Sequence, residues 1–241
     1  MFFSSSTGAP PIAVLLLGSF ALAGCNTINP VEDLQAAVPN AAYLAMYDAE
    51  TDEKFSIPAS DISRIDERFL RTVVSYTTEE RPGTIVIDTR NRHLYLTMEN
   101  GQAVRYGIGV GGVGMSWSGR AQVGRKAEWP RWTPTPAMIR RDPDRNRPWA
   151  NGMLPGLSNP LGPRALYLHQ GGRDTLYRIH GTNEPHTIGQ AVSSGCIRML
   201  NQDIIDLYSR VPAGAQVVVM PDVPDPETEV PVANSRAGSV S

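Results

Sequence analysis

The chain has few of the residues that build disulfide frameworks or metal centres: its 241 residues include two cysteines and four histidines. The histidines lack the H-x-x-x-H and H-E-x-x-H spacings of zinc peptidases; they are His93, His169, His180 and His186. The formal net charge is −2, and without a run of Lys and Arg nothing favours nucleic-acid binding. We therefore expect no metal, no cofactor and no nucleic-acid partner, and a fold held by its hydrophobic core.

The N-terminal apolar stretch, Pro11–Gly24, is too short to span a bilayer comfortably but has about the length of a signal-peptide core. It ends Leu-Ala-Gly before Cys25, which resembles a bacterial lipobox and implies a lipoprotein-type signal peptide over residues 1–24. By that resemblance, Cys25 would be lipidated. Because Asn26 is not an inner-membrane retention Asp, a periplasmic lipoprotein anchored in the outer membrane is expected. Met1–Pro10 lacks the usual Lys or Arg, so an incidental cysteine is the alternative.

If Cys25 carries lipid, Cys196 is the one remaining thiol, a pattern typical of a reactive cysteine. It stands in the string S-S-G-C-I-R-M, sixteen residues after His180 of H-G-T. A thiol attacks a carbonyl as thiolate, and a neighbouring imidazole can take its proton. Gly195 allows a tight turn that can direct backbone N–H groups at an oxyanion. The pattern predicts acyl transfer by Cys196; a small buried hydrophobe is the alternative.

These strings, with Ile188-Gly189 between them and Asp203 after them, resemble the catalytic signature of the bacterial L,D-transpeptidases. The resemblance runs from about Gly83 to Met220. It implies Cys196 as nucleophile and His180 as general base, with the Gly181 carbonyl orienting the imidazole. Where the common motif has a second histidine before Gly-Cys, this chain has Ser194.

Further roles follow from the same motif. Backbone groups of Ser194, Gly195 and Cys196 would stabilise the oxyanion. Arg198 would bind a substrate carboxylate, the alternative being a salt bridge to Asp203. Thr182 and Ser193 would assist substrate binding, or would only satisfy local turns.

The family resemblance implies a peptidoglycan tetrapeptide stem as substrate, cut before its terminal D-Ala through a thioester. The acceptor would be an amine of a second stem, a D-amino acid or an envelope protein. Water as acceptor would make the enzyme an L,D-carboxypeptidase, and a lipid-anchored wall-binding protein without activity is a further alternative. A papain-like peptidase is disfavoured, because in that family the cysteine precedes the histidine.

Periodicity predicts a mainly β fold, a sandwich or barrel with a few short helices, and the family fold agrees. Expected strands are 84–89, 93–98, 103–110, 165–170, 175–180 and 216–220; expected helices are one near 41–47, one from Asp61 through about 74 and one from Asn201, as its cap, to Tyr208.

Four regions are expected. Residues 1–24 form the signal peptide, 25–81 a tether and N-terminal helix, 82–220 the catalytic domain and 221–241 a disordered tail. Within the domain, residues 115–161 predict a long Trp/Pro-rich loop that carries all four tryptophans. Those tryptophans would line a substrate groove, or plug the core under the loop.

Overall fold

The computed structural model describes residues 41–51, 53–112, 117–193 and 195–221. The chain divides into two compact units, residues 1–35 and 36–241, and the described residues belong to the second. The strands are β1 (Thr72–Ser75), β2 (Ile85–Asp88), β3 (His93–Thr97), β4 (Gln102–Gly107), β5 (Val110–Gly111), β6 (Gly119–Glu128), β7 (Arg164–Gln170), β8 (Arg173–His180), β9 (Ala191–Ser193), β10 (Ile197–Arg198) and β11 (Gln216–Val219). The α-helices are α1 (Ala41–Met46), α2 (Pro136–Arg141), α3 (Pro143–Asn146) and α4 (Asn201–Arg210). The mainly β fold with few short helices is therefore confirmed.

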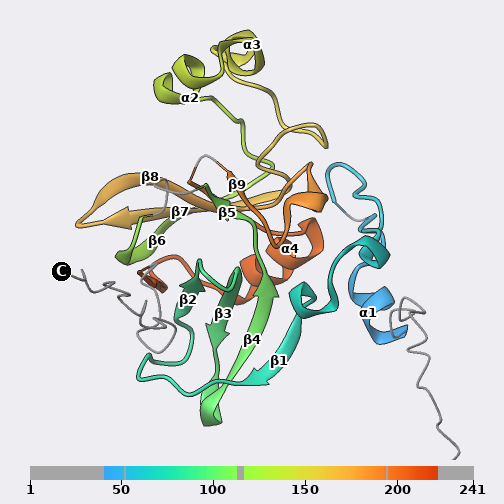
Figure 1. Cartoon of the computed structure of the whole chain (residues 1–241), viewed down its shortest axis with the longest axis vertical. Coiled ribbons are helices and arrows are strands. Elements are labelled where there is room, and N and C mark those ends of the chain that lie inside the picture. Colours follow the sequence, from blue (N-terminus) through green and yellow to red (C-terminus); the bar gives the residue numbers. More distant parts are fainter. Residues whose placement is uncertain (1–40, 52, 113–116, 194, 222–241) are drawn as a thin grey trace, which may run out of the picture. The chain divides into compact units, whose positions relative to one another are not determined.

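Nine of the described strands form one sheet, in the order β1-β4-β3-β2-β11-β6-β7-β8-β10, while β5 pairs with β9. Strand β11 joins the two halves, because it runs parallel to β2 on one side and antiparallel to β6 on the other. Figure 1 shows β1–β4 and β6–β8 as two groups of strands with α4 between them. The last strand of the chain thus ties the early meander to the β7–β8 hairpin that ends at His180.

The core is built from β-branched and aliphatic side chains of these strands together with α4. In β2, Ile85, Val86 and Ile87 are all buried, so this strand is covered on both faces. Helix α4 contributes Ile204 and Leu207, which are fully buried in the same cluster. Burying one such side chain stabilises the fold by roughly 1.5–3 kcal/mol. The helix is thereby held against β8 and β10, which carry residues of the H-G-T and S-S-G-C-I-R-M strings.

The prediction of one helix from Asp61 to about residue 74 is wrong. The segment forms two short 3-10 turns, Ile62–Arg64 and Glu67–Phe69, and then β1, which pairs with β4. Ile62 and Phe69 are buried against Ile188 and Leu200, while Val73 is exposed. The apolar residues of this segment contact the domain separately and do not form one face of a helix. Tertiary packing outweighs a local pattern of this length.

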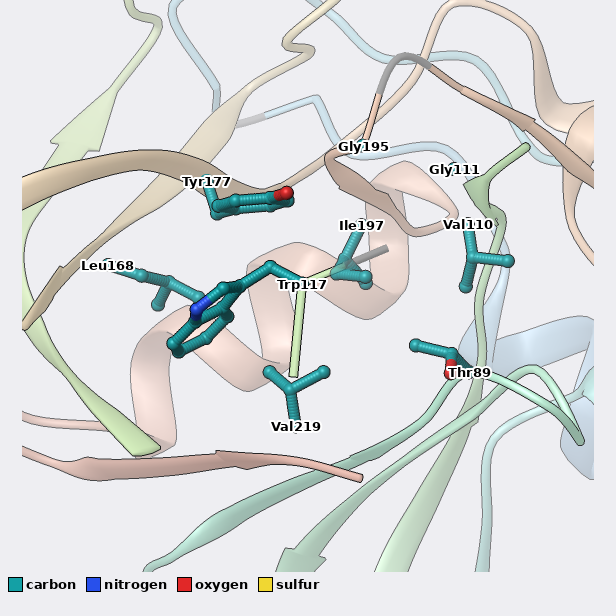
Figure 2. Close-up of a pocket in the computed structure, with 9 residues that line it drawn as sticks. All are labelled: Thr89, Val110, Gly111, Trp117, Leu168, Tyr177, Gly195, Ile197 and Val219. Atoms are coloured by element: carbon teal, nitrogen blue, oxygen red, sulfur yellow. The ribbon is translucent and has the colours of Figure 1, made fainter. Parts of the chain in front are cut away.

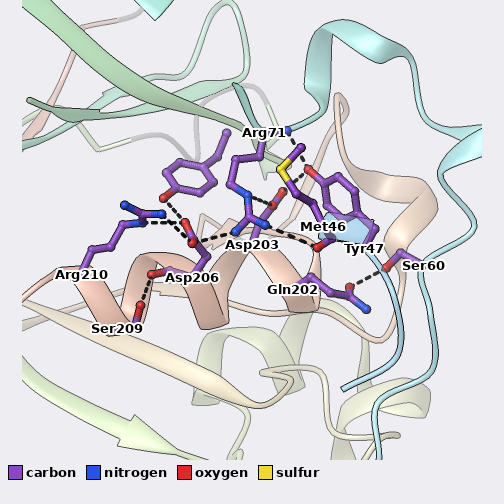
Figure 3. A network of polar contacts seen from close by, with 10 residues as sticks. Met46, Tyr47, Ser60, Arg71, Gln202, Asp203, Asp206, Ser209 and Arg210 are labelled. Atoms are coloured by element: carbon purple, nitrogen blue, oxygen red, sulfur yellow. Dashed lines mark hydrogen bonds and ion pairs between the residues drawn. The ribbon is translucent and has the colours of Figure 1, made fainter. Parts of the chain in front are cut away.

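Residues 41–71, hereafter the N-terminal segment, belong to the same packed unit. Tyr47 is 1% exposed and lies in a cluster with Leu200, which directly precedes α4. Polar contacts add to this packing, since Arg71 Nη1 pairs with Asp206 of α4 at 3.0 Å and Ser60 Oγ donates to Gln202 Oε1 at 2.7 Å. Figure 3 shows these side chains converging on α4. The part of the predicted tether that the structure describes is thus folded onto the domain.

Residues 115–161 are more regular than the predicted loop. They contain the ten-residue strand β6, which pairs with β7 and β11, and the short helices α2 and α3. Ala121 and Val123 of β6 are buried and alternate with exposed Arg120 and Gln122. This alternation of period two was present in the sequence, but two small apolar residues are a weak signal beside many Gly, Arg and Pro residues.

Other expected elements are confirmed with small changes. The strands at 84–89, 93–98, 165–170, 175–180 and 216–220 correspond to β2, β3, β7, β8 and β11, and the helices near 41–47 and 201–208 to α1 and α4. The strand expected over 103–110 is divided: β4 ends at Gly107, and β5 begins at Val110.

Candidate active site

Strands β8 and β10 bring the two motif strings together. They pair in parallel, with Ile197 opposite Ile179 and Arg198 opposite His180. Continuing this register by one residue sets Cys196 beside Arg178. The backbone amide of Met199 donates to the carbonyl of His180 at 2.9 Å and extends the pairing. The cysteine and the histidine are thus one diagonal step apart on neighbouring strands.

Alternation along both strands puts Arg178, His180, Cys196 and Arg198 on one face, here called the β8–β10 face. The electrostatics agree with this placement, because the charges of Arg178 and Arg198 act on the pKa of both His180 and Cys196. Two cations therefore surround a candidate nucleophile and a candidate base.

His180 is 5% exposed and carries a fixed hydrogen bond. Its Nδ1–H donates to the carbonyl oxygen of Gly181 at 2.6 Å, as the family resemblance implied. A carbonyl only accepts, so the proton sits on Nδ1 and Nε2 is left as the basic nitrogen. Burial lowers the pKa of His180 to about 4, and hydrogen bonds with the backbone of Gly181 and of Pro160 oppose that fall. The imidazole is uncharged at neutral pH and can accept a proton.

Cys196 is half-buried, and its thiol points toward the β8 backbone. Sγ lies 3.9 Å from the carbonyl oxygen of Leu176, to which the thiol donates. Burial raises the pKa of the Cys196 thiol, while the backbone N–H and the guanidinium of Arg178 oppose that rise. The thiol and the imidazole are therefore both neutral at rest. A nucleophilic role of the sulfur would require it to lose its proton.

Each arginine of the β8–β10 face already has a carboxylate partner. Arg178 makes two hydrogen bonds with Asp174, at 2.7 and 2.8 Å. Arg198 Nη1 donates to Glu184 Oε2 at 2.7 Å. Burial would raise the pKa of Glu184, but the guanidinium groups of Arg198 and Arg145 outweigh it and hold that pKa below its usual value. Neutralised pairs of this kind limit how far the arginines can favour the thiolate.

The alternative partner predicted for Arg198, Asp203, is wrong. Asp203 lies on α4, where it is 0% exposed, accepts a hydrogen bond from Tyr47 at 3.2 Å and faces Arg71. Sequence proximity suggested the pair, but α4 turns the Asp203 side chain toward the N-terminal segment. The partner of Arg198, Glu184, comes from the loop after Thr182.

The turn before Cys196 is partly described. Gly195 has a φ of +119°, a conformation that L side chains rarely adopt, so glycine is needed there. Ser194 lies outside the described residues. Ser193 ends β9, which pairs with β5.

Thr182 is placed in a local turn. It is 3% exposed, and its hydroxyl accepts from the backbone N–H of Glu184 at 2.9 Å. The backbone N–H of Thr182 donates to the side chain of Asn201 at 2.9 Å. This residue therefore connects the H-G-T string both to the partner of Arg198 and to α4.

A narrow, mostly apolar pocket adjoins the nucleophile turn. Figure 2 shows Trp117 and Tyr177 in it, with Gly195 and Ile197 beside them. The two aromatic rings lie 5.6 Å apart at a tilt of 32°. The pocket therefore begins at the residue that directly precedes Cys196. Its remaining lining residues are Thr89, Val110, Gly111, Leu168 and Val219.

The tryptophans have different surroundings, and one of them has the predicted role in the core. Trp129 is 6% exposed, packs against Phe55 and donates from Nε1 to Glu53 at 2.9 Å, so it belongs to the interior. Trp117 lines the pocket, and Trp149 is 40% exposed beyond α3.

The structure describes no group of three or more His, Cys, Asp or Glu side chains arranged to hold a metal ion. Among the same residues, every helix is too short or too polar to cross a bilayer. The predicted signal peptide over residues 1–24, the lipidation site Cys25 and the tail beyond residue 221 lie outside the described residues.

Sequence reasoning missed three residues that the fold brings to this site. Arg178 lies two positions before His180, and strand alternation alone could have placed it on the same face. Glu184 and Asn201 had no such signal, because a loop and a helix start bring them in.

The sequence that contains this site is similar to those of known proteins. Residues 82–219 match the family model described as YkuD, L,D-transpeptidase catalytic domain. An Escherichia coli K12 protein described as a probable L,D-transpeptidase, ErfK/SrfK, is 37% identical over 144 residues, 58% of this chain and 44% of that protein. The E. coli K12 protein described as probable L,D-transpeptidase YbiS is 35% identical over 139 residues, 56% of this chain and 43% of that protein. The chain thus spans less than half the length of these curated relatives.

Solved structures were also matched. A Brucella melitensis structure titled probable carnitine operon oxidoreductase CaiA is 50% identical, with 66% of this chain and 99% of that chain covered, at a TM-score of 0.45. The activity in that title is stated of the Brucella protein. An L,D-transpeptidase from Mycobacterium smegmatis is 16% identical, with 57% of this chain and 58% of that chain covered, at a TM-score of 0.43.

Proposed function

Because the chain belongs to the YkuD family of L,D-transpeptidase catalytic domains, we propose that it is a cysteine-dependent transpeptidase of peptidoglycan stem peptides. One argument carries this proposal: extending the β8–β10 pairing by one residue puts Cys196 on the same face as His180, and the imidazole has its Nδ1–H committed to the Gly181 carbonyl. That arrangement leaves Nε2 as the nitrogen that can take the thiol proton.

The first half-reaction is the attack of Cys196 on the carbonyl carbon of the peptide bond before the terminal D-Ala. The S–C bond forms as the thiol proton passes to His180 Nε2, and the C–N bond then breaks. The departing D-Ala amine takes that proton from the imidazolium, so a thioester and a neutral imidazole remain. The backbone amides of Ser194, Gly195 and Cys196 would stabilise the tetrahedral oxyanion.

The two arginines of the β8–β10 face would assist this reaction without taking part in bond formation. Arg198, 15% exposed in its side chain, would attract a substrate carboxylate while remaining paired with Glu184. Thr182 and Ser193 would contact the stem or only support the turn. Arg178 and Arg198 together favour the charged sulfur as it develops.

In the second half-reaction an amine attacks the thioester and regenerates the thiol. The acceptor would be the amine of a second stem, which gives a cross-link between the third residues of two stems, or a D-amino acid or an envelope protein.

We propose for the leader that residues 1–24 are removed and that Cys25 carries the lipid, placing the enzyme in the periplasm on the outer membrane. The support is the Leu-Ala-Gly-Cys string after the apolar stretch. Metabolic labelling with a fatty-acid probe should label the wild-type protein and leave Cys25→Ser unlabelled. Equal labelling of both would contradict lipidation at Cys25.

The function is tested by incubating the purified protein with disaccharide-tetrapeptide and identifying the products by mass. Cross-linked dimer, or exchange of the terminal residue when a D-amino acid is added, is the expected result. Tripeptide alone would indicate an L,D-carboxypeptidase, and an unchanged substrate together with tight binding to sacculi would indicate a binding protein.

A second experiment identifies the nucleophile independently of the acceptor. A carbapenem should acylate the wild-type protein and add its mass to the peptide that contains Cys196. The Cys196→Ala variant should show no adduct. An adduct on that variant, or on another residue of the wild type, would contradict the assignment.

A further inference from the structure

Asn201 has a contact that the sequence did not predict. We expected it to cap the helix, but Leu200 occupies the N-cap position and Asn201 is the first residue of α4. Its side-chain oxygen, Oδ1, instead accepts the backbone N–H of Thr182 at 2.9 Å. The start of α4 is therefore tied to the H-G-T string of the active site.

The N–H that Asn201 holds belongs to the same peptide unit as the carbonyl that orients His180. A trans peptide is planar, and the C=O of Gly181 and the N–H of Thr182 point in opposite directions within that plane. The Gly181 oxygen accepts from His180 Nδ1 at 2.6 Å. A hydrogen bond that fixes the N–H end of the plane therefore also fixes the direction of the C=O end.

Packing leaves this peptide unit little room to rotate. A Cβ on Gly181 would lie 2.5 Å from Asn201 Oδ1 and 2.8 Å from Pro163 Cδ. A Cβ on Gly162 would lie 2.7 Å from the same oxygen and 2.9 Å from the backbone of Gly181. The two glycines let the chain come this close to the amide.

We propose that Asn201 is a positioning residue, which sets the tautomer and ring orientation of His180 through the Gly181–Thr182 peptide. With the carbonyl held toward Nδ1, the proton stays on Nδ1 and Nε2 remains available for the Cys196 thiol. Without the Asn201 oxygen, the peptide can turn, and the imidazole can place its proton on Nε2. This inference rests on the proposed function, since it assigns to His180 the role of base.

The test compares Asn201→Ala with a neighbouring control. Gln202, the next residue of α4, donates to the carbonyls of Asp48 and Pro58, both at 3.1 Å, and accepts from Ser60 at 2.7 Å. Gln202→Ala therefore removes polar contacts from the same helical turn without touching the Gly181–Thr182 peptide. Asn201→Asp keeps an oxygen that can accept the Thr182 N–H.

The decisive measurement is the ¹⁵N NMR spectrum of the histidine rings in the full-length protein, with the His180 signals assigned from a His180→Ala sample. The wild type and Asn201→Asp should hold the Nδ1–H tautomer of His180. Asn201→Ala should show a substantial Nε2–H population. Its kcat should fall about 10- to 100-fold with little change in KM, because a small misplacement of a catalytic group has costs of that order.

Gln202→Ala should keep both the tautomer and kcat, even where its thermal midpoint falls as far as that of Asn201→Ala. An unchanged tautomer in Asn201→Ala, or equal losses of kcat in the two alanine variants, would overturn the proposal. If the wild type has no transpeptidase activity, the proposed function fails while the tautomer comparison still decides the role of Asn201.

Discussion

His180 on the β8–β10 face and Asp203 in the contact between α4 and the N-terminal segment are both buried, and burial shifts their pKa values in opposite directions. His180 is 5% exposed, and its pKa falls to about 4. Asp203 is 0% exposed, and burial raises its pKa to about 7, against the charge of Arg71. Loss of solvation disfavours the charged form in both cases, which removes the proton from a base and retains it on an acid.

The two regions differ in how their charges are paired. On the β8–β10 face each arginine has its own carboxylate, Arg178 with Asp174 and Arg198 with Glu184. At α4 the charges are shared, because Arg71 lies 3.0 Å from Asp206 Oδ1 and 3.8 Å from Asp203 Oδ1, and Asp206 also pairs with Arg210 at 2.9 Å (Figure 3). Asp203 Oδ1 has no hydrogen bond, which suits a carboxyl that is partly protonated. In the first region the candidate nucleophile and base, Cys196 and His180, are both uncharged. In the second region the ion pairs attach the N-terminal segment to the domain.

The largest effect is expected from removing the base. His180→Ala should lower kcat by about 10²- to 10⁴-fold, since general-base catalysis contributes at that level. His186 is exposed on the 3-10 turn Pro185–Thr187, outside the β8–β10 face, and His169 lies on β7, so alanine at either position should cost much less. Turnover of disaccharide-tetrapeptide measures all three. Equal losses at the three positions would remove His180 from the role of base.

A large effect on stability, without an effect on chemistry, is expected at the other region. Arg71→Met leaves the buried Asp203 carboxyl without its cation, while the half-buried Asp206 keeps Arg210, and should lower the free energy of unfolding by about 3 kcal/mol. Asp203→Asn removes a group that is already partly neutral and should cost less than half as much. Urea unfolding at pH 7 gives both values. If Arg71→Met were as stable as the wild type, the network would not hold the N-terminal segment.

The pH dependence of stability separates the two buried groups. Between pH 4 and 6.5 the unfolded chain protonates His180 and the folded protein does not, so this group contributes stability that is lost as pH falls. Asp203 keeps its proton in the folded protein up to about pH 7, so its contribution is lost as pH rises. The two slopes oppose each other in the wild type.

Asp203→Asn should expose the slope due to His180. The free energy of unfolding of this variant should rise by about 3 kcal/mol more than that of the wild type between pH 4 and 6.5. Denaturant unfolding at several pH values measures this difference between the two proteins. The other carboxylates are present in both, so their contributions to the pH dependence cancel. Parallel curves for the two proteins would contradict the raised pKa of Asp203.

The smallest effect is expected from removing the carboxylate that pairs with Arg198 on the β8–β10 face. Glu184→Gln removes the carboxylate partner of Arg198, so the guanidinium should favour the thiolate and lower the pKa of Cys196. Alkylation by iodoacetamide at pH 8 should then be about two-fold faster. Asp144→Asn, which makes the same charge change on exposed α3, is the control. An unchanged or slower rate in Glu184→Gln would show that Arg198 does not act on the sulfur.

Much of the site could be predicted from the sequence, because each of its two motif strings is a short run of neighbouring residues. The family resemblance is confirmed by the match over residues 82–219. The hydrogen bond from His180 to the Gly181 carbonyl is present, and strand periodicity predicted β8, which carries His180. Neighbouring residues such as these are placed by strand and turn geometry, which a short sequence pattern already specifies.

Other features depended on contacts between distant segments. The apolar spacing from Ile62 to Val73 resembled a helix, but Phe69 packs against Leu200 and residues 72–75 pair with β4. Strand β6 has few large apolar residues, and pairing with β7 and β11 stabilises it. In both places the free energy comes from partners far along the chain, and a local pattern does not contain them.

The sequence by itself determined which reactive groups are available, a cysteine and a histidine in glycine-containing strings. It also determined the family to which the chain belongs. Only the tertiary structure decided the charge states and the supporting contacts. Burial makes His180 neutral, Glu184 rather than Asp203 pairs with Arg198, and Asn201 of α4 holds the peptide that orients the imidazole. Solvation and hydrogen-bond partners depend on what surrounds a group in space, and the order of residues along the chain does not specify that environment.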